Sequence, residues 1–216
     1  MTDFEQITLD QIALETIKEV PAASGLHDII RHRWSPRSFS EKAVSAEDLT
    51  KVFTAASWAA SSNNEQPWRF LVGRKGTDTY AKILDSLVEF NQKWASSAPV
   101  LYVSAAKSHF SKDQTRNGFA LHDTGAASAT LSLEAAALGL HTHGMGGFSK
   151  DKIRTHFSIP DDFEIGAAWA LGYLGEPTAL PGFLQTMETA PRSRKPLADL
   201  VFNKWNEPAT FSGIPG

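Results

Sequence analysis

Two arginines and a serine in the segment Arg33-Trp34-Ser35-Pro36-Arg37 have the types and spacing to bind a phosphate group. The guanidinium groups of Arg33 and Arg37 flank the hydroxyl of Ser35, just after a stretch that is typical of a short helix. An arginine fork matches two phosphate oxygens at once, and a serine hydroxyl can donate a further hydrogen bond. The segment therefore predicts an anion site.

A second basic cluster, Arg192-Ser193-Arg194-Lys195, lies near the other end of the chain. If the fold brings the two clusters together, they form a pocket that suits a phosphorylated cofactor. Charge alone is explained equally well by two unrelated, solvated clusters.

Two hydroxyl and three amide side chains lie in the segment 61–68, among them those of Ser62, Asn64 and Gln66. An amide offers both a donor and an acceptor, which suits a pyrimidine or flavin ring edge with alternating N–H and C=O groups. Taken by itself, the segment is better explained as an ordinary polar loop.

The turn Gly144-Met145-Gly146-Gly147 has few side chains where a strand is expected to end and a helix to begin. Backbone N–H groups there can approach a flat ring or an anion closely. The G-x-G-x-x-G spacing of dinucleotide-binding folds is absent, so a bare turn is an equally good interpretation.

Two further patterns favour no site. His141 and His143 share one face of a predicted strand, but without a neighbouring carboxylate or third histidine a structural role is favoured over metal binding. His122 and Asp123 are helix neighbours that we expect to point apart, and no G-x-S-x-G elbow accompanies them. A metal-dependent or serine hydrolase is therefore the weakest of the alternatives.

The composition is that of an ordinary soluble globular protein, with 42% hydrophobic and 21% charged residues among 216. The formal net charge of -3 argues against broad nucleic-acid binding. The absence of cysteine excludes thiolate metal sites and a cysteine nucleophile, and it fits a cytoplasmic location. No apolar run reaches membrane-spanning length, so we expect no membrane segment.

Apolar periodicity and capping residues predict the elements that position these residues. Helices are expected at 4–20, at 24–31, from Ser45 with Asp48 in its first turn, at 77–94, at 120–138, and from Ser149 to just before Pro160. Strands are expected at 68–72, 100–105, 141–145 and 165–174. This order lacks a regular β-α-β-α rhythm and predicts an α+β fold, with a sheet flanked by helices.

Three segments have special character. The helix at 120–138 is apolar on nearly every side, which predicts a central core helix or a subunit interface. Residues 107–118 are polar and predict a mobile loop. The tail from Gly175 has little periodicity, but its aromatic residues favour packing along a neighbouring surface over disorder.

Taken in chain order, four segments resemble the FMN-dependent nitroreductase family: R-W-S-P-R-S-F at 33–39, N-x-Q-P-W-R-F at 64–70, G-M-G-G-F at 144–148 and R-S-R-K-P-L at 192–197. The helix at 123–140 also looks like that family's central helix, and the similarity covers about residues 27–200. Each motif is weak alone, but four in this order are fairly specific.

The resemblance implies one nitroreductase-like α+β domain over residues 1–216, with a central, mostly antiparallel sheet of four to five strands flanked by helices. It further implies a homodimer with two FMN sites at its interface, each built by both subunits. Residues 175–216 would then be an extended segment that packs on the partner subunit.

The same resemblance implies the cofactor contacts. The phosphate would be bound by Arg33, Ser35, Arg37 and Arg194, with Arg192 nearby and Trp34 contributing mainly its backbone. Asn64 and Gln66, with Ser62, would lie near the ring or ribityl chain, and Met145, Gly146 and Gly147 would place a backbone N–H against flavin N5. No metal and no catalytic side chain is implied.

The chain departs from the family pattern at Gly146, where many relatives have an acidic residue, which leaves substrate preference open. Lys93 is a loosely aligned candidate for a ring contact, and a solvated lysine is the preferred interpretation. Phe110 and Phe119 are the candidates for a lid over the acceptor pocket.

The implied activity is a ping-pong transfer of hydride from NAD(P)H through flavin N5 to a nitroaromatic, quinone or enone acceptor. The alternative is a non-catalytic protein that stores or senses FMN. The sequence does not distinguish NADH from NADPH.

Overall fold

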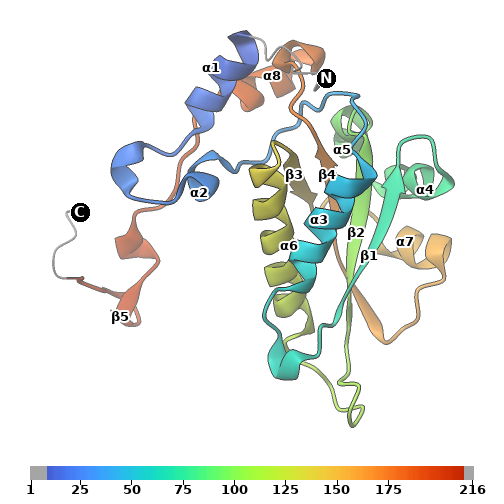
Figure 1. The fold of residues 1–216 in the computed structure, drawn as a ribbon. Coiled ribbons are helices and arrows are strands. Elements are labelled where there is room, and N and C mark those ends of the chain that lie inside the picture. The colour runs from blue at the N-terminus through green and yellow to red at the C-terminus, as the bar shows by residue number, and fades with distance from the viewer. Residues whose placement is uncertain (1–8, 212–216) are drawn as a thin grey trace.

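The computed structural model describes residues 9–211 and is built around a four-stranded sheet with helices on both faces (Figure 1). Every pair of neighbouring strands is antiparallel, and the spatial order is β1-β2-β4-β3. The strands are β1 (Trp68–Arg74), β2 (Val100–Lys107), β3 (His141–Met145) and β4 (Phe163–Gly172). This arrangement confirms the predicted α+β fold and antiparallel sheet.

Helices α3 (Ala46–Ser57) and α6 (Ala120–Ala137) cover one face of the sheet (Figure 1). Their buried residues pack against Tyr102 and Leu171 of the sheet in one hydrophobic cluster. Ser45 caps α3 as predicted, because its side chain accepts the backbone N–H of Asp48.

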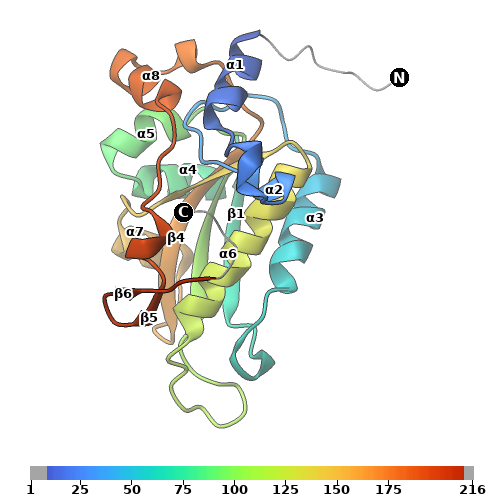
Figure 2. The same cartoon turned by 90° about the vertical axis from the view of Figure 1, so that its left-hand side faces the viewer.

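The other face is covered by α4 (Asp78–Ser86), α5 (Glu89–Ala95), α7 (Lys150–Phe157) and α8 (Gly182–Thr189), as Figures 1 and 2 show. A second hydrophobic cluster fills this layer, and it includes Ile83, Trp94, Ile153 and Leu184. The sheet is therefore buried on both faces.

The predicted helix over 77–94 is wrong, because the chain forms α4 and α5 with a break at Leu87 and Val88. Both residues have extended backbone, and Leu87 forms an antiparallel bridge with Phe148. The N–H of Val88 donates to the carbonyl of Gly147 at 3.0 Å. Tertiary pairing with the turn after β3 thus replaces helix continuation.

The tail after β4 has more regular structure than its weak periodicity predicts. It contains α8, two 3₁₀ turns at Pro177–Ala179 and Leu197–Asp199, and a hairpin of β5 (Phe202–Lys204) and β6 (Glu207–Pro208). The sequence analysis predicts no helix after Gly175, and α8 shows that this prediction is wrong. The cause of the error is that α8 is only two turns long and has no side-chain cap.

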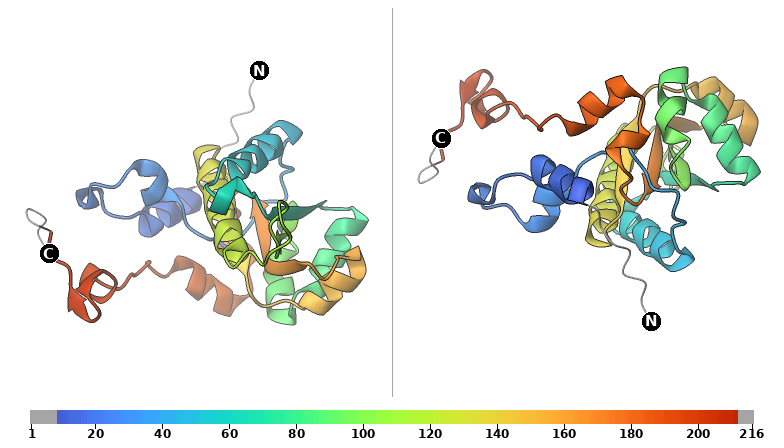
Figure 3. Two further views of the ribbon diagram at one scale, coloured as in Figure 1. Left: turned by 90° about the horizontal axis from the view of Figure 1, so that it is seen from below. Right: turned by 90° about the horizontal axis from the view of Figure 1, so that it is seen from above.

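The N-terminal segment contains α1 (Leu9–Lys18), a 3₁₀ turn at Ala22–Ser24 and α2 (Asp28–His32). The predicted helices over 4–20 and 24–31 are thus both present but shorter, and residues 4–8 lie outside the described part of the chain. In Figure 3 this segment and the β5–β6 segment project from the sheet on the same side. Within the described residues, no helix combines the length and apolarity that crossing a membrane requires.

Candidate cofactor-binding site

The two basic clusters converge on one pocket of about 190 Å³. The pocket is lined by Arg33, Ser35 and Arg37 from the segment after α2, and by Arg192 and Arg194 from the segment after α8. Trp34 also lines it, although its indole is buried and packs edge-on against His141. The interpretation as two unrelated, solvated clusters is therefore wrong.

The backbone of the arginine segment is held from several elements. His143 of β3 lies with Nδ1 2.8 Å from the carbonyl oxygen of Pro36, and the Glu188 carboxylate of α8 accepts the N–H of Arg37 at 2.8 Å. The guanidinium of Arg192 donates to the carbonyls of Arg33 and Arg31, at 2.7 and 2.6 Å. Arg192 therefore holds the backbone of the pocket in place and also contributes positive charge to it.

The cations of the pocket lie close enough to repel one another. Burial lowers the pKa of Arg33, and the positive charge of Arg194 lowers it further. Burial likewise lowers the pKa of Arg192, with Arg33 and Arg194 adding to the effect. An anion of two negative charges would relieve this repulsion.

Two charged residues of the pocket escaped the sequence prediction: Lys18 at the end of α1 and Glu188 in α8. Lys18 is 5% exposed, donates to the carbonyl of Ala190 and lies 5.0 Å from the centre of a Trp34 ring. Burial lowers the pKa of Lys18, while the nearby Glu188 carboxylate raises it. Lys18 lies four residues after the buried Leu14, and Glu188 lies four residues after the buried Leu184. Each charge is therefore on the apolar face of its helix, and that position in the pattern could have indicated a buried role.

The donor set of the pocket fits a phosphate group. Within the described residues, the buried Nε atoms of Arg37 and Arg192 have no hydrogen-bond partner, so both still have a donor to offer. A space of about 190 Å³ is too small for a flavin with its ribityl chain, and it suits the phosphate end alone.

The predicted ring-binding residues Ser62, Asn64 and Gln66 lie elsewhere, in and after a 3₁₀ turn at Ser62–Asn64. The N–H of Ser62 donates to the buried carboxylate of Asp123 in the first turn of α6, at 2.9 Å. Asn64 and Gln66 have backbone φ of 54° and 51°, in the left-handed region. The segment is thus a specific, strained turn rather than an ordinary polar loop.

This turn and the segment after α2, which lines the arginine pocket, lie toward opposite ends of α6 (Figure 1). A helix rises about 1.5 Å per residue, which gives roughly 20 Å from Asp123 to the end of α6 at Ala137. A single chain therefore does not bring all the predicted cofactor residues together.

The turn after β3 lies on the pocket side. Its neighbour His143 contacts Pro36, and Gly147 follows four residues later. Met145 is 3% exposed with its side chain in the core, so only its backbone can face a ligand. A Cβ on Gly147 would come within 2.8 Å of the Asn91 amide, while one on Gly146 would meet open space.

The segment 107–118 forms a hydrogen-bonded hairpin rather than an open loop. His109 and Arg116 form an antiparallel bridge, and the Glu65 carboxylate accepts the N–H and hydroxyl of Ser111 at 2.9 and 2.5 Å. This contact ties the hairpin to the turn that holds Ser62, Asn64 and Gln66. Phe110 is part of the hairpin, and Phe119 precedes α6 with 60% of its side chain exposed.

Both histidines of β3 contact other parts of the chain. His141 Nε2 lies 3.1 Å from a Glu15 carboxylate oxygen, and His143 is half-buried with Nδ1 2.8 Å from the Pro36 carbonyl oxygen. Over residues 9–211, no group of three histidine or carboxylate side chains is placed to hold a metal ion. The expectation that His122 and Asp123 point apart is wrong, because the exposed His122 ring lies 3.2 Å from the buried Asp123 carboxylate.

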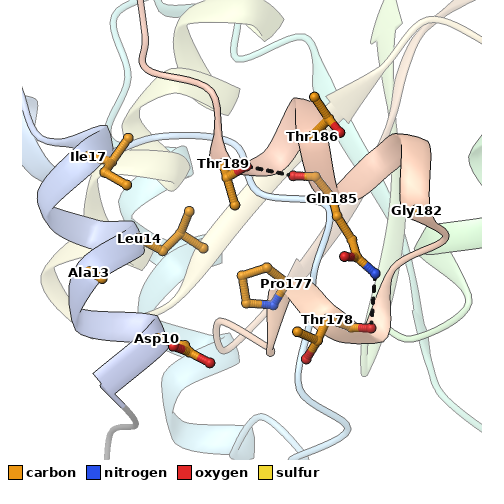
Figure 4. A pocket seen from close by; sticks show the side chains of 10 residues that line it. All are labelled: Asp10, Ala13, Leu14, Ile17, Pro177, Thr178, Gly182, Gln185, Thr186 and Thr189. Atoms are coloured by element: carbon orange, nitrogen blue, oxygen red, sulfur yellow. Dashed lines mark hydrogen bonds between the residues drawn. The ribbon is translucent and has the colours of Figure 1, made fainter.

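Two other features lie outside the arginine pocket. Lys93 pairs with Glu89 one turn earlier in α5 and is half exposed, as a solvated lysine would be. A roomier pocket of about 500 Å³ lies between α1 and α8, and Figure 4 shows its lining. Among the described residues that line it, Asp10 alone carries a charge. The smaller, cationic pocket is therefore the candidate phosphate site.

Comparisons with known proteins identify the family and the fold. The model of the nitroreductase family matches residues 30–92 and 77–173. A crystal structure described as an oxidoreductase containing FMN is 36% identical and superposes with a TM-score of 0.79, over 86% of this chain and 93% of that one. A nitroreductase family protein from Clostridium difficile 630 has the same fold, with a TM-score of 0.64 over 82% of this chain and 96% of that one, at 24% identity.

Two relatives each match about two thirds of this chain. The "Uncharacterized 15.4 kDa protein in ask 5'region" of Mycolicibacterium smegmatis is 31% identical over 65% of this chain and 99% of its own length. The "Putative NADH dehydrogenase/NAD(P)H nitroreductase" of Archaeoglobus fulgidus is 29% identical over 67% of this chain and 83% of its own length. With the family model spanning the arginine segment, α6 and the whole four-stranded sheet, this chain belongs to the nitroreductase family.

Proposed function

We propose that this protein is an FMN-dependent oxidoreductase that uses NAD(P)H to reduce a nitroaromatic, quinone or enone. The convergence of Arg33, Arg37 and Arg194 on one phosphate-sized pocket carries the proposal. The FMN named for the 36% identical crystal structure, and the NAD(P)H named for the Archaeoglobus fulgidus relative, support this choice of cofactor and reductant.

We infer that the complete cofactor site needs two copies of the chain. The phosphate pocket and the turn at Ser62–Asn64 lie toward opposite ends of α6, so the second copy would supply the turn. An exposed stripe on α6 supports this arrangement, since Leu121, Gly125 and Ala129 follow one another at four-residue spacing. Small side chains there let a second helix approach closely.

In such a dimer the residues of this chain divide the work. Arg33, Ser35, Arg37 and Arg194 bind the phosphate, and Arg192 and His143 hold the backbone that carries them. The backbone after Met145 and the partner's turn with Ser62, Asn64 and Gln66 orient the ring, while Phe110 and Phe119 border the acceptor space.

When bound, FMN would supply the redox chemistry of a ping-pong hydride transfer from NAD(P)H to the acceptor. The protein contributes position and charge. Because one open ring face accepts many flat molecules, we expect broad acceptor use.

The test is a visible absorption spectrum of the purified protein, followed by NAD(P)H oxidation with an added quinone. We expect flavin absorption in the blue and steady turnover that depends on the quinone. A coloured protein without turnover would support the alternative, a protein that stores or senses FMN. A colourless protein that gains no colour when FMN is added would refute both.

A further inference from the structure

Glu188 is a buried carboxylate beside a pocket that is otherwise cationic. Its side chain is 1% exposed, near the end of α8. Its two oxygens accept the backbone N–H of Arg37 at 2.8 and 3.0 Å, and one of them also accepts the N–H of Ser38 at 3.0 Å. These N–H groups belong to the segment that presents Arg33, Ser35 and Arg37 to the pocket.

A negative charge here has the wrong sign for attracting a phosphate. Burying a carboxylate is also costly unless hydrogen bonds and opposite charges compensate for the lost water. The compensation is present, because two N–H groups bind the carboxylate and the Lys18 ammonium is held nearby. This arrangement is explained if the carboxylate holds the backbone of the arginine segment in place and does not attract the ligand.

The anchored segment is otherwise free of regular secondary structure on its pocket side. Arg33 to Arg37 lie between the end of α2 and the bridge from Phe39 to Leu174, a stretch without a helical or strand ladder to fix it. Glu188 supplies the acceptors that such a ladder would supply for Arg37 and Ser38. The position of the Arg37 side chain therefore depends on α8.

We propose that Glu188 is a positioning residue for the cofactor phosphate, which fixes the backbone at Arg37 and Ser38 before the phosphate binds. This inference rests on the proposed function, since it takes the phosphate to be that of FMN. It assigns a role to a residue of α8, which belongs to neither of the two basic clusters.

Two variants separate geometry from charge. Glu188→Gln keeps the shape but removes the charge and one acceptor, while Glu188→Asp keeps the charge and shortens the reach by one carbon. We expect both to weaken FMN binding about tenfold or more, the range for losing hydrogen bonds to a charged group. The affinity for riboflavin, which lacks the phosphate, should stay within about twofold, measured by fluorescence quenching on flavin-stripped protein.

If Glu188 acted only through its charge, the outcome would have the opposite sign. Glu188→Gln would then bind FMN more tightly than the unmodified protein, and Glu188→Asp would bind it equally well. Either result would overturn the proposal. Asp161→Asn, which removes a fully exposed carboxylate after α7, is the charge-matched control and should leave FMN affinity unchanged.

Amide hydrogen exchange on the unmodified protein avoids any failure of a variant to fold. In flavin-stripped protein we expect the amides of Arg37 and Ser38 to exchange slowly, with little further protection when FMN is added. Fast exchange that slows only with FMN would overturn the positioning role. Failure of the proposed function is a separate observation, namely that the unmodified protein binds no FMN at all.

Discussion

At the scale of single residues, the arginines that line the pocket differ in what their guanidinium groups contact. Arg192 uses its guanidinium on the carbonyls of Arg31 and Arg33. Among the described residues, the Arg33 guanidinium donates one hydrogen bond, a long one of 3.4 Å to the Ser35 hydroxyl, and Arg194 donates to the carbonyl of its own neighbour, Ser193. Their loss should therefore have different consequences.

Arg33→Ala should weaken FMN binding by about 1.5–3 kcal/mol, because one charge-assisted contact is lost. Its melting temperature should stay close to that of the unmodified protein. Titration of flavin-stripped protein with FMN measures the first quantity and thermal unfolding measures the second. Lys51→Ala, which removes an exposed cation of α3, is the control and should change neither. A variant that retains FMN fully would contradict the phosphate role.

Arg192→Ala should lower both FMN affinity and the free energy of unfolding, because two backbone carbonyls lose their donor. We expect about 1–3 kcal/mol of destabilisation in urea unfolding of the flavin-stripped protein. Unchanged stability would show that these two hydrogen bonds contribute nothing to the fold.

His143 should make stability depend on pH. Burial lowers the pKa of His143 to about 4, the hydrogen bond with Pro36 partly opposes this, and the charge of Arg37 lowers it further. The unfolded chain binds a proton at this residue near pH 6.5, so between pH 6.5 and 4 it holds more protons than the folded chain. The free energy of unfolding should therefore fall as pH drops through this window, by on the order of 3 kcal/mol.

Urea unfolding at pH 7 and pH 4.5 measures this effect. His143→Asn can still donate to the Pro36 carbonyl but does not titrate, so its loss of stability over the same range should be smaller. An equal loss in both proteins would assign the pH dependence to other groups.

At the scale of elements, the hairpin at 107–118 and the turn at Ser62–Asn64 act as one unit through the Glu65–Ser111 contact. Phe119 stands beside this unit, largely exposed in the single chain. In the proposed dimer this is the ring end of the cofactor site, so Phe119 is well placed to contact acceptors.

Phe119→Ala should change the relative kcat/KM values for a quinone, a nitroaromatic and an enone by about threefold or more, while FMN affinity stays the same. A loss of about 1 kcal/mol of aromatic contact corresponds to roughly a fivefold change. Steady-state kinetics with the three acceptors measures it. Identical ratios in the variant and the unmodified protein would remove Phe119 from the acceptor pocket.

At the scale of the whole molecule, the proposed dimer explains why the halves of the cofactor site lie toward opposite ends of α6. It also gives a role to the N-terminal and C-terminal segments that project on one side of the sheet (Figure 3). The exposed hydrophobic side chains of Ile12, Leu26, Leu200 and Trp205 lie on these segments. In the proposed dimer we expect the partner to cover these side chains.

Gly125→Glu should yield a monomer that no longer retains FMN. Within the described chain a Cβ at this position meets no atom within 4 Å, so the fold itself should tolerate the change. Light scattering after size-exclusion chromatography measures the mass, and absorption measures bound flavin. Ala81→Glu, on the exposed side of α4, is the matched control. A Gly125→Glu protein that stays dimeric would place the interface elsewhere.

The sequence by itself determined the elements whose periodicity or caps are strong. The helix that Ser45 caps, the apolar helix α6 and the strand over 141–145 follow from local patterns. The arginine motifs also indicated an anion site, because guanidinium and hydroxyl groups donate hydrogen bonds that match the oxygens of a phosphate. These features depend on neighbours within a few residues.

Only the tertiary structure decided the features that depend on distant partners. The break between α4 and α5 arises because Val88 bonds to Gly147, and the carboxylate of Glu188 is meaningful only where it meets Arg37. The placement of the turn at Ser62–Asn64 at the far end of α6 is likewise set by Asp123. Hydrogen bonds across 59 to 151 residues leave no periodic trace in a sequence, since the pairing exists only after the chain has folded.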